Sequence, residues 1–177
     1  MRKSPFHVTQ AGLWIAALTL AACKEADSPT ATSPFPGRPT FTVGSGIAVT
    51  PLARGTIDPF HIQSFYEGHL TVLQSPQASD IVVNSATLAA GGTTGWHSHP
   101  GPVVVTIKTG ALTIYDAGDC RPVLHPAGTA YIEPGGSKDI HVGRNEGATP
   151  VEWVATLFVG VGVTTRIDAP APANCPH

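Results

Sequence analysis

Glycine and proline recur at short intervals along this chain, and they limit what it can fold into. The 177 residues include 19 glycines and 17 prolines. Proline interrupts helices, glycine weakens them, and both favour turns. The segments between them are short and β-prone, which predicts strands at 41–50, 57–65, 70–74, 81–89, 103–109, 112–116, 130–133, 140–144 and 151–167. Many short strands separated by turns indicate an all-β sandwich or barrel.

The first 22 residues have the features of an export signal. Arg2 and Lys3 precede an apolar run over residues 11–20, which is too short for a permanent membrane helix. The run ends at Leu20-Ala21-Ala22-Cys23, which resembles the bacterial lipobox. This resemblance implies a lipoprotein signal peptide over residues 1–22, a lipid anchor on Cys23, and a membrane-anchored protein of the bacterial cell envelope that faces the periplasm or the exterior. The alternative is an ordinary secretory signal with an incidental cysteine.

The segment after the signal differs in composition from the rest of the chain. Residues 23–40 are rich in proline, serine and threonine and contain almost no large apolar side chain. Such a segment cannot bury enough surface to fold. We therefore expect a lipidated cysteine followed by a flexible tether over residues 23–40, and a folded domain over residues 41–177.

Two cysteines follow the tether, Cys120 and Cys175. An even number of cysteines in an exported chain favours a disulfide. Such a bond would fasten the C-terminal tail to the body of the domain. Two free thiols are the alternative.

Charge and motifs exclude several classes of function. Only 12% of the residues are charged, the formal net charge is −2, and no basic patch stands out, so nucleic acid is not an expected partner. No G-x-S-x-G motif supports a serine nucleophile. No glycine-rich run has the pattern of a phosphate loop or of a dinucleotide-binding turn.

A pair of histidines gives the first indication of chemistry. His97 and His99 are two residues apart, so on an extended backbone both side chains lie on the same face. Neutral imidazole is the commonest metal ligand in proteins. The pair therefore predicts part of a metal site, with Trp96 and Ser98 on the opposite face.

The surroundings of this pair resemble the two sequence motifs of the cupin superfamily. The first motif has a glycine, five residues, His-x-His and a later glycine; the second has a glycine, five residues, Pro-x-Gly, a histidine and, after three residues, an asparagine. The matching positions are Gly91, His97, His99 and Gly110, followed by Gly128, Pro134, Gly136, His141 and Asn145. The resemblance implies a single cupin-type jelly-roll barrel in a small bacterial cupin-domain protein. It also implies that His97, His99 and His141 hold a divalent transition metal: Fe, Mn, Ni, Cu or Zn.

The chain departs from these motifs in two ways. The position of the first motif's glutamate holds Val103, which shares the parity of the two histidines and cannot coordinate a metal. The second motif has two extra residues before His141, which places Asp139 where the histidine usually lies. Asp139 and Glu133 are therefore candidate additional ligands.

A site of three histidines leaves coordination positions open for water, substrate or dioxygen. It resembles the sites of cupin dioxygenases that act on thiols, diketones and gentisate, which implies an oxygenase or isomerase acting on a small organic molecule. The alternative is a non-catalytic cupin that binds a sugar or a metabolite at the cell envelope. Whether the protein is an enzyme stays open at this point, and cupins of this kind often form homodimers. Retention of the three histidines argues against a third hypothesis, a purely structural envelope protein.

Candidate cavity-lining aromatic residues are Tyr115, Tyr131 and Trp153.

Overall fold

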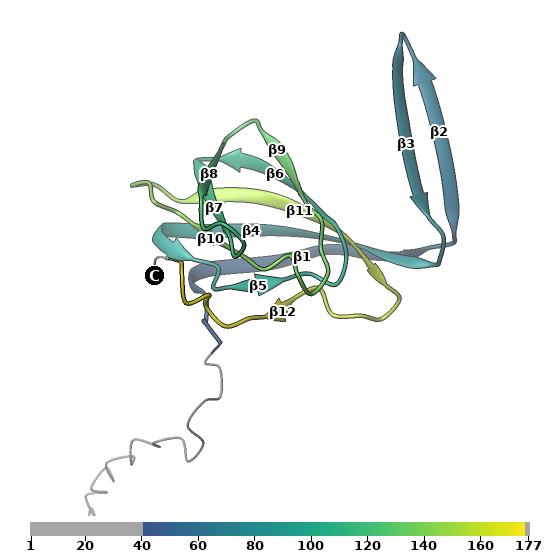
Figure 1. Cartoon of the computed structure of the whole chain (residues 1–177). Helices are drawn as coiled ribbons and strands as arrows, with labels where there is room; N and C mark the ends of the chain where they lie inside the picture. Colours follow the sequence, from purple (N-terminus) through teal and green to yellow (C-terminus); the bar gives the residue numbers. More distant parts are fainter. Residues whose placement is uncertain (1–40, 176–177) are drawn as a thin grey trace, which may run out of the picture. The chain divides into compact units, whose positions relative to one another are not determined.

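The computed structural model describes residues 41–175, and all of its regular elements in that range are β-strands (Figure 1). Among these residues there is no helix with the length and apolar character needed to cross a membrane. The predicted signal peptide, the lipidation of Cys23 and the tether lie outside the described range. The strands are β1 (Ser45–Ile57), β2 (Phe60–Tyr66), β3 (His69–Ser75), β4 (Ser79–Thr93), β5 (His97–Ser98), β6 (Val103–Thr109), β7 (Ala111–Asp116), β8 (Pro122–Pro126), β9 (Ala130–Glu133), β10 (His141–Arg144), β11 (Val151–Gly160) and β12 (Ile167–Asp168).

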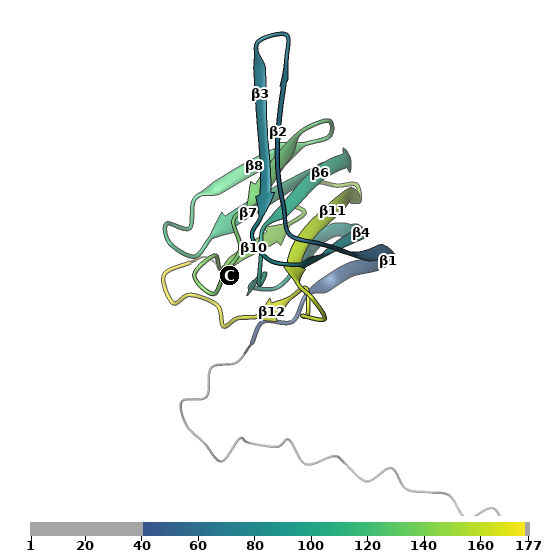
Figure 2. The ribbon, with the colours of Figure 1, turned by 90° about the vertical axis from the view of Figure 1, so that its right-hand side faces the viewer.

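Ten strands form one folded-over antiparallel sheet (Figures 1 and 2). One face has the order β1-β4-β11-β6-β9, and the other has the order β12-β5-β10-β7-β8. The faces join where Thr93 of β4 pairs with Arg144 of β10. This is a jelly-roll arrangement, so the predicted all-β fold is confirmed.

The core lies between the two faces and follows from the two-residue period of the strands. In β11, Val151, Trp153, Leu157 and Val159 are buried, whereas the alternating residues are more accessible. Inward-facing Leu88 of β4 and the buried valines of β6 complete this cluster. Removal of such apolar side chains from water is the main favourable term in folding.

A second, smaller cluster lies on the outer side of β10. Trp96 and Val142 pack there with the C-terminal tail, where Cys175 is also buried. Cys175 forms a disulfide with Cys120, and the two Cα atoms are 5.3 Å apart. The predicted disulfide is therefore confirmed, and Trp96 faces away from the histidines as their spacing predicts.

The strands β2 and β3 form a separate hairpin that pairs with no other strand of the described range. Its turn is Glu67-Gly68, where both residues have positive φ (47° and 84°), as the type I′ hairpin turn requires. Most of its apolar side chains are exposed; Phe65 and Tyr66 are each 72% accessible. The hairpin adds no residue to the core clusters.

Several strand predictions differ from the structure, and three of the differences concern the first strand, β8 and the last long strand. The first strand continues through Pro51 to Ile57, which is possible because β1 is an edge strand whose unpaired side needs no N–H donor. No strand is predicted over residues 122–126, yet this segment forms the edge strand β8. The last long strand ends at Gly160 instead of 167, because the chain turns there and Val163 N–H bonds back to the Gly160 carbonyl.

Candidate metal centre

Strand pairing brings the three motif histidines together from two distant segments. His97 opens β5 and lies directly opposite His141 of β10 in the antiparallel ladder. Opposite residues of such a pair project on the same side of the sheet. His99, two residues after His97, adds a third ring from the same segment. The ring centroids are 4.9 Å apart for His97–His99 and 4.6 Å apart for His97–His141.

Each histidine is oriented by a hydrogen bond to a backbone carbonyl. The Nδ1–H groups donate to the carbonyls of Gly95 at 2.8 Å (His97), Thr165 at 2.5 Å (His99) and Asp139 at 3.2 Å (His141). A carbonyl can only accept, so in each ring Nδ1 carries the hydrogen. The lone pair of a neutral ring is then on Nε2.

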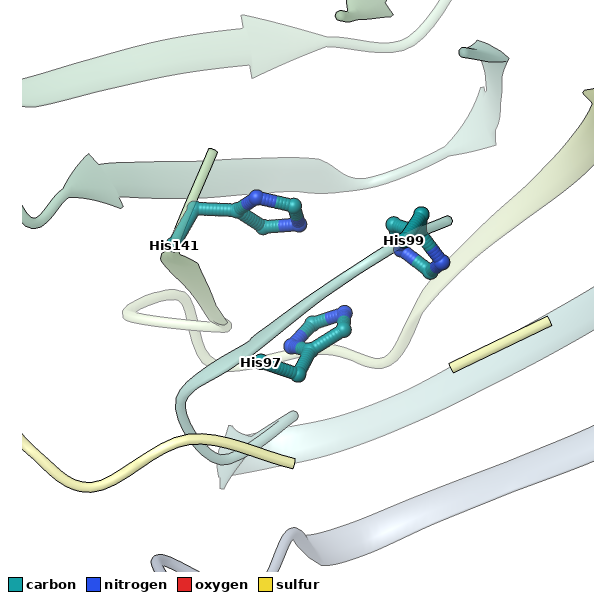
Figure 3. A group of neighbouring side chains, drawn as sticks. All are labelled: His97, His99 and His141. Atoms are coloured by element: carbon teal, nitrogen blue, oxygen red, sulfur yellow. The ribbon is translucent and has the colours of Figure 1, made fainter. Parts of the chain in front are cut away.

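The three rings face one another (Figure 3). One ligand atom from each of them lies within 4.8 Å of the others. The Nε2 atom of His141 is buried and has no hydrogen-bond partner within the described part of the chain. An unpartnered buried acceptor is costly, and a metal ion at the centre of the group would satisfy it. The donor set therefore fits a divalent transition metal.

Burial keeps the imidazoles of His97 and His99 neutral. It lowers the pKa of His97 to about 2 and that of His99 to about 4, and the positive charges of the neighbouring histidines and of Arg166 act in the same direction. Both rings are therefore unprotonated at neutral pH. Metal binding requires this form.

Glu133 lies next to the same centre. Its Oε2 is 3.3 Å from His99 Nε2, and its Oε1 is 3.4 Å from His141 Nε2. The Tyr131 hydroxyl donates to Oε1 at 3.3 Å. Burial raises the pKa of the Glu133 carboxyl above its usual value.

The other carboxylate suggested by the sequence is placed differently. Oδ2 of Asp139 accepts the Gly135 N–H at 2.8 Å and lies 3.9 Å from His141 Nδ1, on the side of the ring opposite to Nε2. Its side chain therefore holds the loop before β10 and does not join the convergent group. The two extra residues of this loop explain the difference, because they move the histidine two positions along the strand.

A cavity of about 130 Å³ adjoins the histidines, between the two faces of the sheet. Most of its wall is apolar, and Val103 faces it from β6, as its parity predicts. Tyr131 and Trp153 also line it, whereas Tyr115 does not: its hydroxyl donates to Glu146, and its ring lies beneath Arg144. The lining residues are Ile47, Val49, Asn84, Ala86, Thr94, His97, His99, Val103, Val105, Leu112, Ile114, Tyr131, Glu133, His141, Gly143, Trp153, Ala155, Leu157, Thr165 and Arg166.

The two motifs are locked together by close backbone contacts. The Gly136 N–H donates to the His99 carbonyl at 2.7 Å. Gly135, with φ of +79°, lies so near Gly101 that a Cβ atom would overlap the Gly101 backbone. The glycines of the second motif therefore allow its loop to approach the first histidine segment.

Asn145 has a structural role at the far end of the same motifs. Its side-chain amide donates to the carbonyls of Leu88 and Thr149, and its backbone bonds with Gly91 and Gly92. It is 2% exposed and does not line the cavity. It therefore holds the first motif's glycine turn against the start of the loop after β10.

Sequence reasoning missed the contribution of the loop after β11. This loop supplies the Thr165 carbonyl that orients His99, and Arg166, which lines the cavity and is held by Asp168 at 2.7 Å and by the Thr94 carbonyl at 2.9 Å. The segment was expected to be part of a long strand. Its one signal was Gly160 and Gly162 near the end of that apolar run.

Comparison with known families agrees with this geometry. Residues 84–159 match a family model described as "Cupin domain". This segment, which is less than half of the chain, is similar to a cupin domain. It contains His97, His99 and His141, so the candidate metal centre lies entirely within the matched segment. No curated protein sequence matches the chain significantly.

Several solved structures are similar to the chain in fold. A cupin superfamily protein from Desulfitobacterium hafniense is 12% identical with a TM-score of 0.44, over 65% of this chain and 79% of that one. A cupin-like protein from Thermotoga maritima is 16% identical with a TM-score of 0.45, over 53% and 68%. An oxalate oxidase is 20% identical with a TM-score of 0.44, over 55% of this chain and about half (51%) of its own length.

Proposed function

We propose that this protein is a metal-dependent cupin oxygenase or isomerase that acts on a small organic molecule. His97, His99 and His141 would hold Fe, Mn, Ni, Cu or Zn. The observation that carries the proposal is the convergence of three Nε2 atoms whose Nδ1–H groups are all bound to backbone carbonyls. A set of imidazoles oriented in this way is arranged for a cation.

The cavity supports a small substrate with an apolar body. Valine, leucine and isoleucine side chains from both faces form much of its wall, and such walls bind an apolar group by removing it from water. The histidines, Glu133 and Arg166 add polar groups to the same wall. A substrate with a polar group at one end would meet both environments.

The residues of the chain position and protect the reacting molecule. A bound metal of this kind supplies an open coordination position and Lewis-acid or redox chemistry. The backbone carbonyls of Gly95, Thr165 and Asp139 keep the imidazoles in place. The apolar walls keep competing water away from the site.

Metal analysis of the purified protein tests the site. We expect wild type to contain about one transition metal per chain and His97→Ala to lose it, because a three-ligand site that loses one ligand binds weakly. His61→Ala is the matched control, since His61 lies on the β2–β3 hairpin and bonds to Gln74. Equal metal contents in wild type and His97→Ala would refute the proposed site.

Oxygen uptake tests the reaction class. The iron-loaded protein is expected to consume oxygen with at least one member of a panel of thiols, diketones and aromatic diols. Iron-loaded protein that consumes none would count against the oxygenase. It would leave the isomerase and the alternative function, non-catalytic binding of a sugar or a metabolite at the cell envelope. Lipidation at Cys23, attachment to the envelope and a homodimeric assembly stay predictions from the sequence.

A further inference from the structure

Glu133 is a buried carboxylate that the three-histidine site does not by itself explain. It is 8% exposed and ends β9 with its side chain in the cavity. Burying a carboxylate costs free energy unless a partner compensates for the lost water. Among the described residues, its hydrogen-bonding partner is the hydroxyl of Tyr131, at the long distance of 3.3 Å.

The contacts of Glu133 with the histidines show what kind of partner is needed. Its two oxygens lie 3.3 Å from His99 Nε2 and 3.4 Å from His141 Nε2. In the neutral rings those nitrogens carry lone pairs, because the one hydrogen of each ring is on Nδ1 and bound to the carbonyl of Thr165 or Asp139. An ionised carboxylate and a neutral ring therefore face each other as two acceptors, and a proton or a metal cation between them removes the repulsion.

The register of the sheet explains how β9 can supply this group. Glu133 lies directly opposite Val103 in the antiparallel pairing of β6 with β9. Side chains at opposite positions lie on the same face with Cβ atoms about 5 Å apart. A carboxylate at 133 and a carboxylate at 103 would therefore reach the same volume from neighbouring strands. In this chain the β6 position is the buried aliphatic residue Val103.

We propose that Glu133 is a fourth protein ligand of the metal. It is supplied by β9, at the position that pairs with Val103 of β6. The inference rests on the proposed metal site and adds one negatively charged oxygen donor to it. The Tyr131 hydroxyl, bonded to Oε1, orients the carboxylate. Three imidazoles and one carboxylate leave room in an octahedral shell for water or substrate.

Titration of the metal-free full chain with Co²⁺, followed by calorimetry and visible absorption, tests the proposal. Glu133→Val should raise the Co²⁺ dissociation constant by about tenfold or more. Removal of a residue that only supports a metal ligand already lowers metal affinity by about this factor. The transposed variant Val103→Glu/Glu133→Val should recover most of that loss. Glu152→Val is the matched control, because Glu152 is a strand carboxylate paired with Lys108 and outside the cavity.

A purely structural role for Glu133 makes a different prediction. As a metal ligand, Glu133 should add nothing to the stability of the metal-free protein, so Glu133→Val should unfold at the same or a higher urea concentration than wild type. The rise in stability on adding Co²⁺ should be smaller in the variant, because weaker binding stabilises less. A metal-free Glu133→Val protein that is strongly destabilised would overturn the ligand assignment.

The remaining outcomes are also decisive. Co²⁺ affinity in Glu133→Val equal to wild type overturns this proposal alone, whereas unchanged affinity in both Glu133→Val and His97→Ala overturns the metal site itself. Failure of the transposed variant to recover affinity while folded also counts against the proposal. If that variant does not fold, Glu133→Gln decides: its Co²⁺ absorption spectrum must differ from that of wild type, and an identical spectrum overturns the assignment.

Discussion

At the scale of single residues, the backbone carbonyls determine what the histidines can do. Each Nδ1–H is bound to a carbonyl of a different loop, those that contain Gly95, Thr165 and Asp139. The three Nε2 atoms are then free to converge. The carbonyls thus supply the orientation that metal-ligating histidines generally receive from an outer partner.

The glycine at position 135 allows a close approach that no other residue permits, and this gives a prediction. Gly135→Ala should lower the free energy of unfolding by about 2–4 kcal/mol, because it combines a positive φ with overlap on the Gly101 backbone. Gly128→Ala is the control: its φ is +84° and no atom lies near its Cβ position, so it should lose only about 1 kcal/mol. Urea denaturation measures both, and equal losses would contradict the importance of the contact.

At the scale of elements, strand register decides which side chains share the cavity. The pairing of His97 with His141 unites the two motifs, and the pairing of Val103 with Glu133 brings a carboxylate beside them. A shift of one residue in either ladder would turn these side chains to the other face. The positions of the side chains in the site therefore depend on the register of the β5–β10 and β6–β9 pairs.

The β2–β3 hairpin is an element that the domain should not need. Replacing residues 58–78 with an Asn-Gly turn that links Ile57 to Ser79, the last pair of β1 and β4, should change the free energy of unfolding by about 1 kcal/mol or less. An isolated two-stranded hairpin is only marginally stable, and this one contributes nothing to the core clusters. Urea denaturation and Co²⁺ titration of the shortened chain provide the measurement. Loss of cooperative unfolding would show that the hairpin supports the fold.

At the scale of the whole described domain, the C-terminal tail is tied to the metal-site segment. The Ala169 N–H donates to the Trp96 carbonyl, next to His97, and the disulfide Cys120–Cys175 fastens the end of the tail. The tail also covers Trp96 in the outer cluster. The tail therefore supports the side of the histidine segment that faces away from the cavity.

This tie predicts a large effect of removing the disulfide. Cys120→Ser/Cys175→Ser should lose about 4 kcal/mol of unfolding free energy, the loop-closure value for cysteines 55 residues apart in sequence. Denaturation of wild type with and without reductant gives an independent check, because reduction should cause a similar loss. Variant and wild type with the same denaturation midpoint would show that the bond does not constrain the unfolded chain.

The sequence by itself determined the fold class and the candidate metal-ligand pattern of the described domain. Strand alternation and turn residues are local properties, so they indicated an all-β domain directly. The spacing of His97, His99 and His141 within the two motifs indicated the donors for the same reason, since each motif is a contiguous segment. The even pair of cysteines indicated the disulfide.

Only the tertiary structure decided which other groups reach the site. Glu133 and Asp139 were equivalent candidates in the sequence, and strand pairing and loop length place one beside Nε2 and the other beside Nδ1 of His141. Thr165 and Arg166 join the site through a turn that local patterns did not predict. These relations depend on the pairing of distant segments. A single sequence encodes such pairing only through the packing of the whole domain.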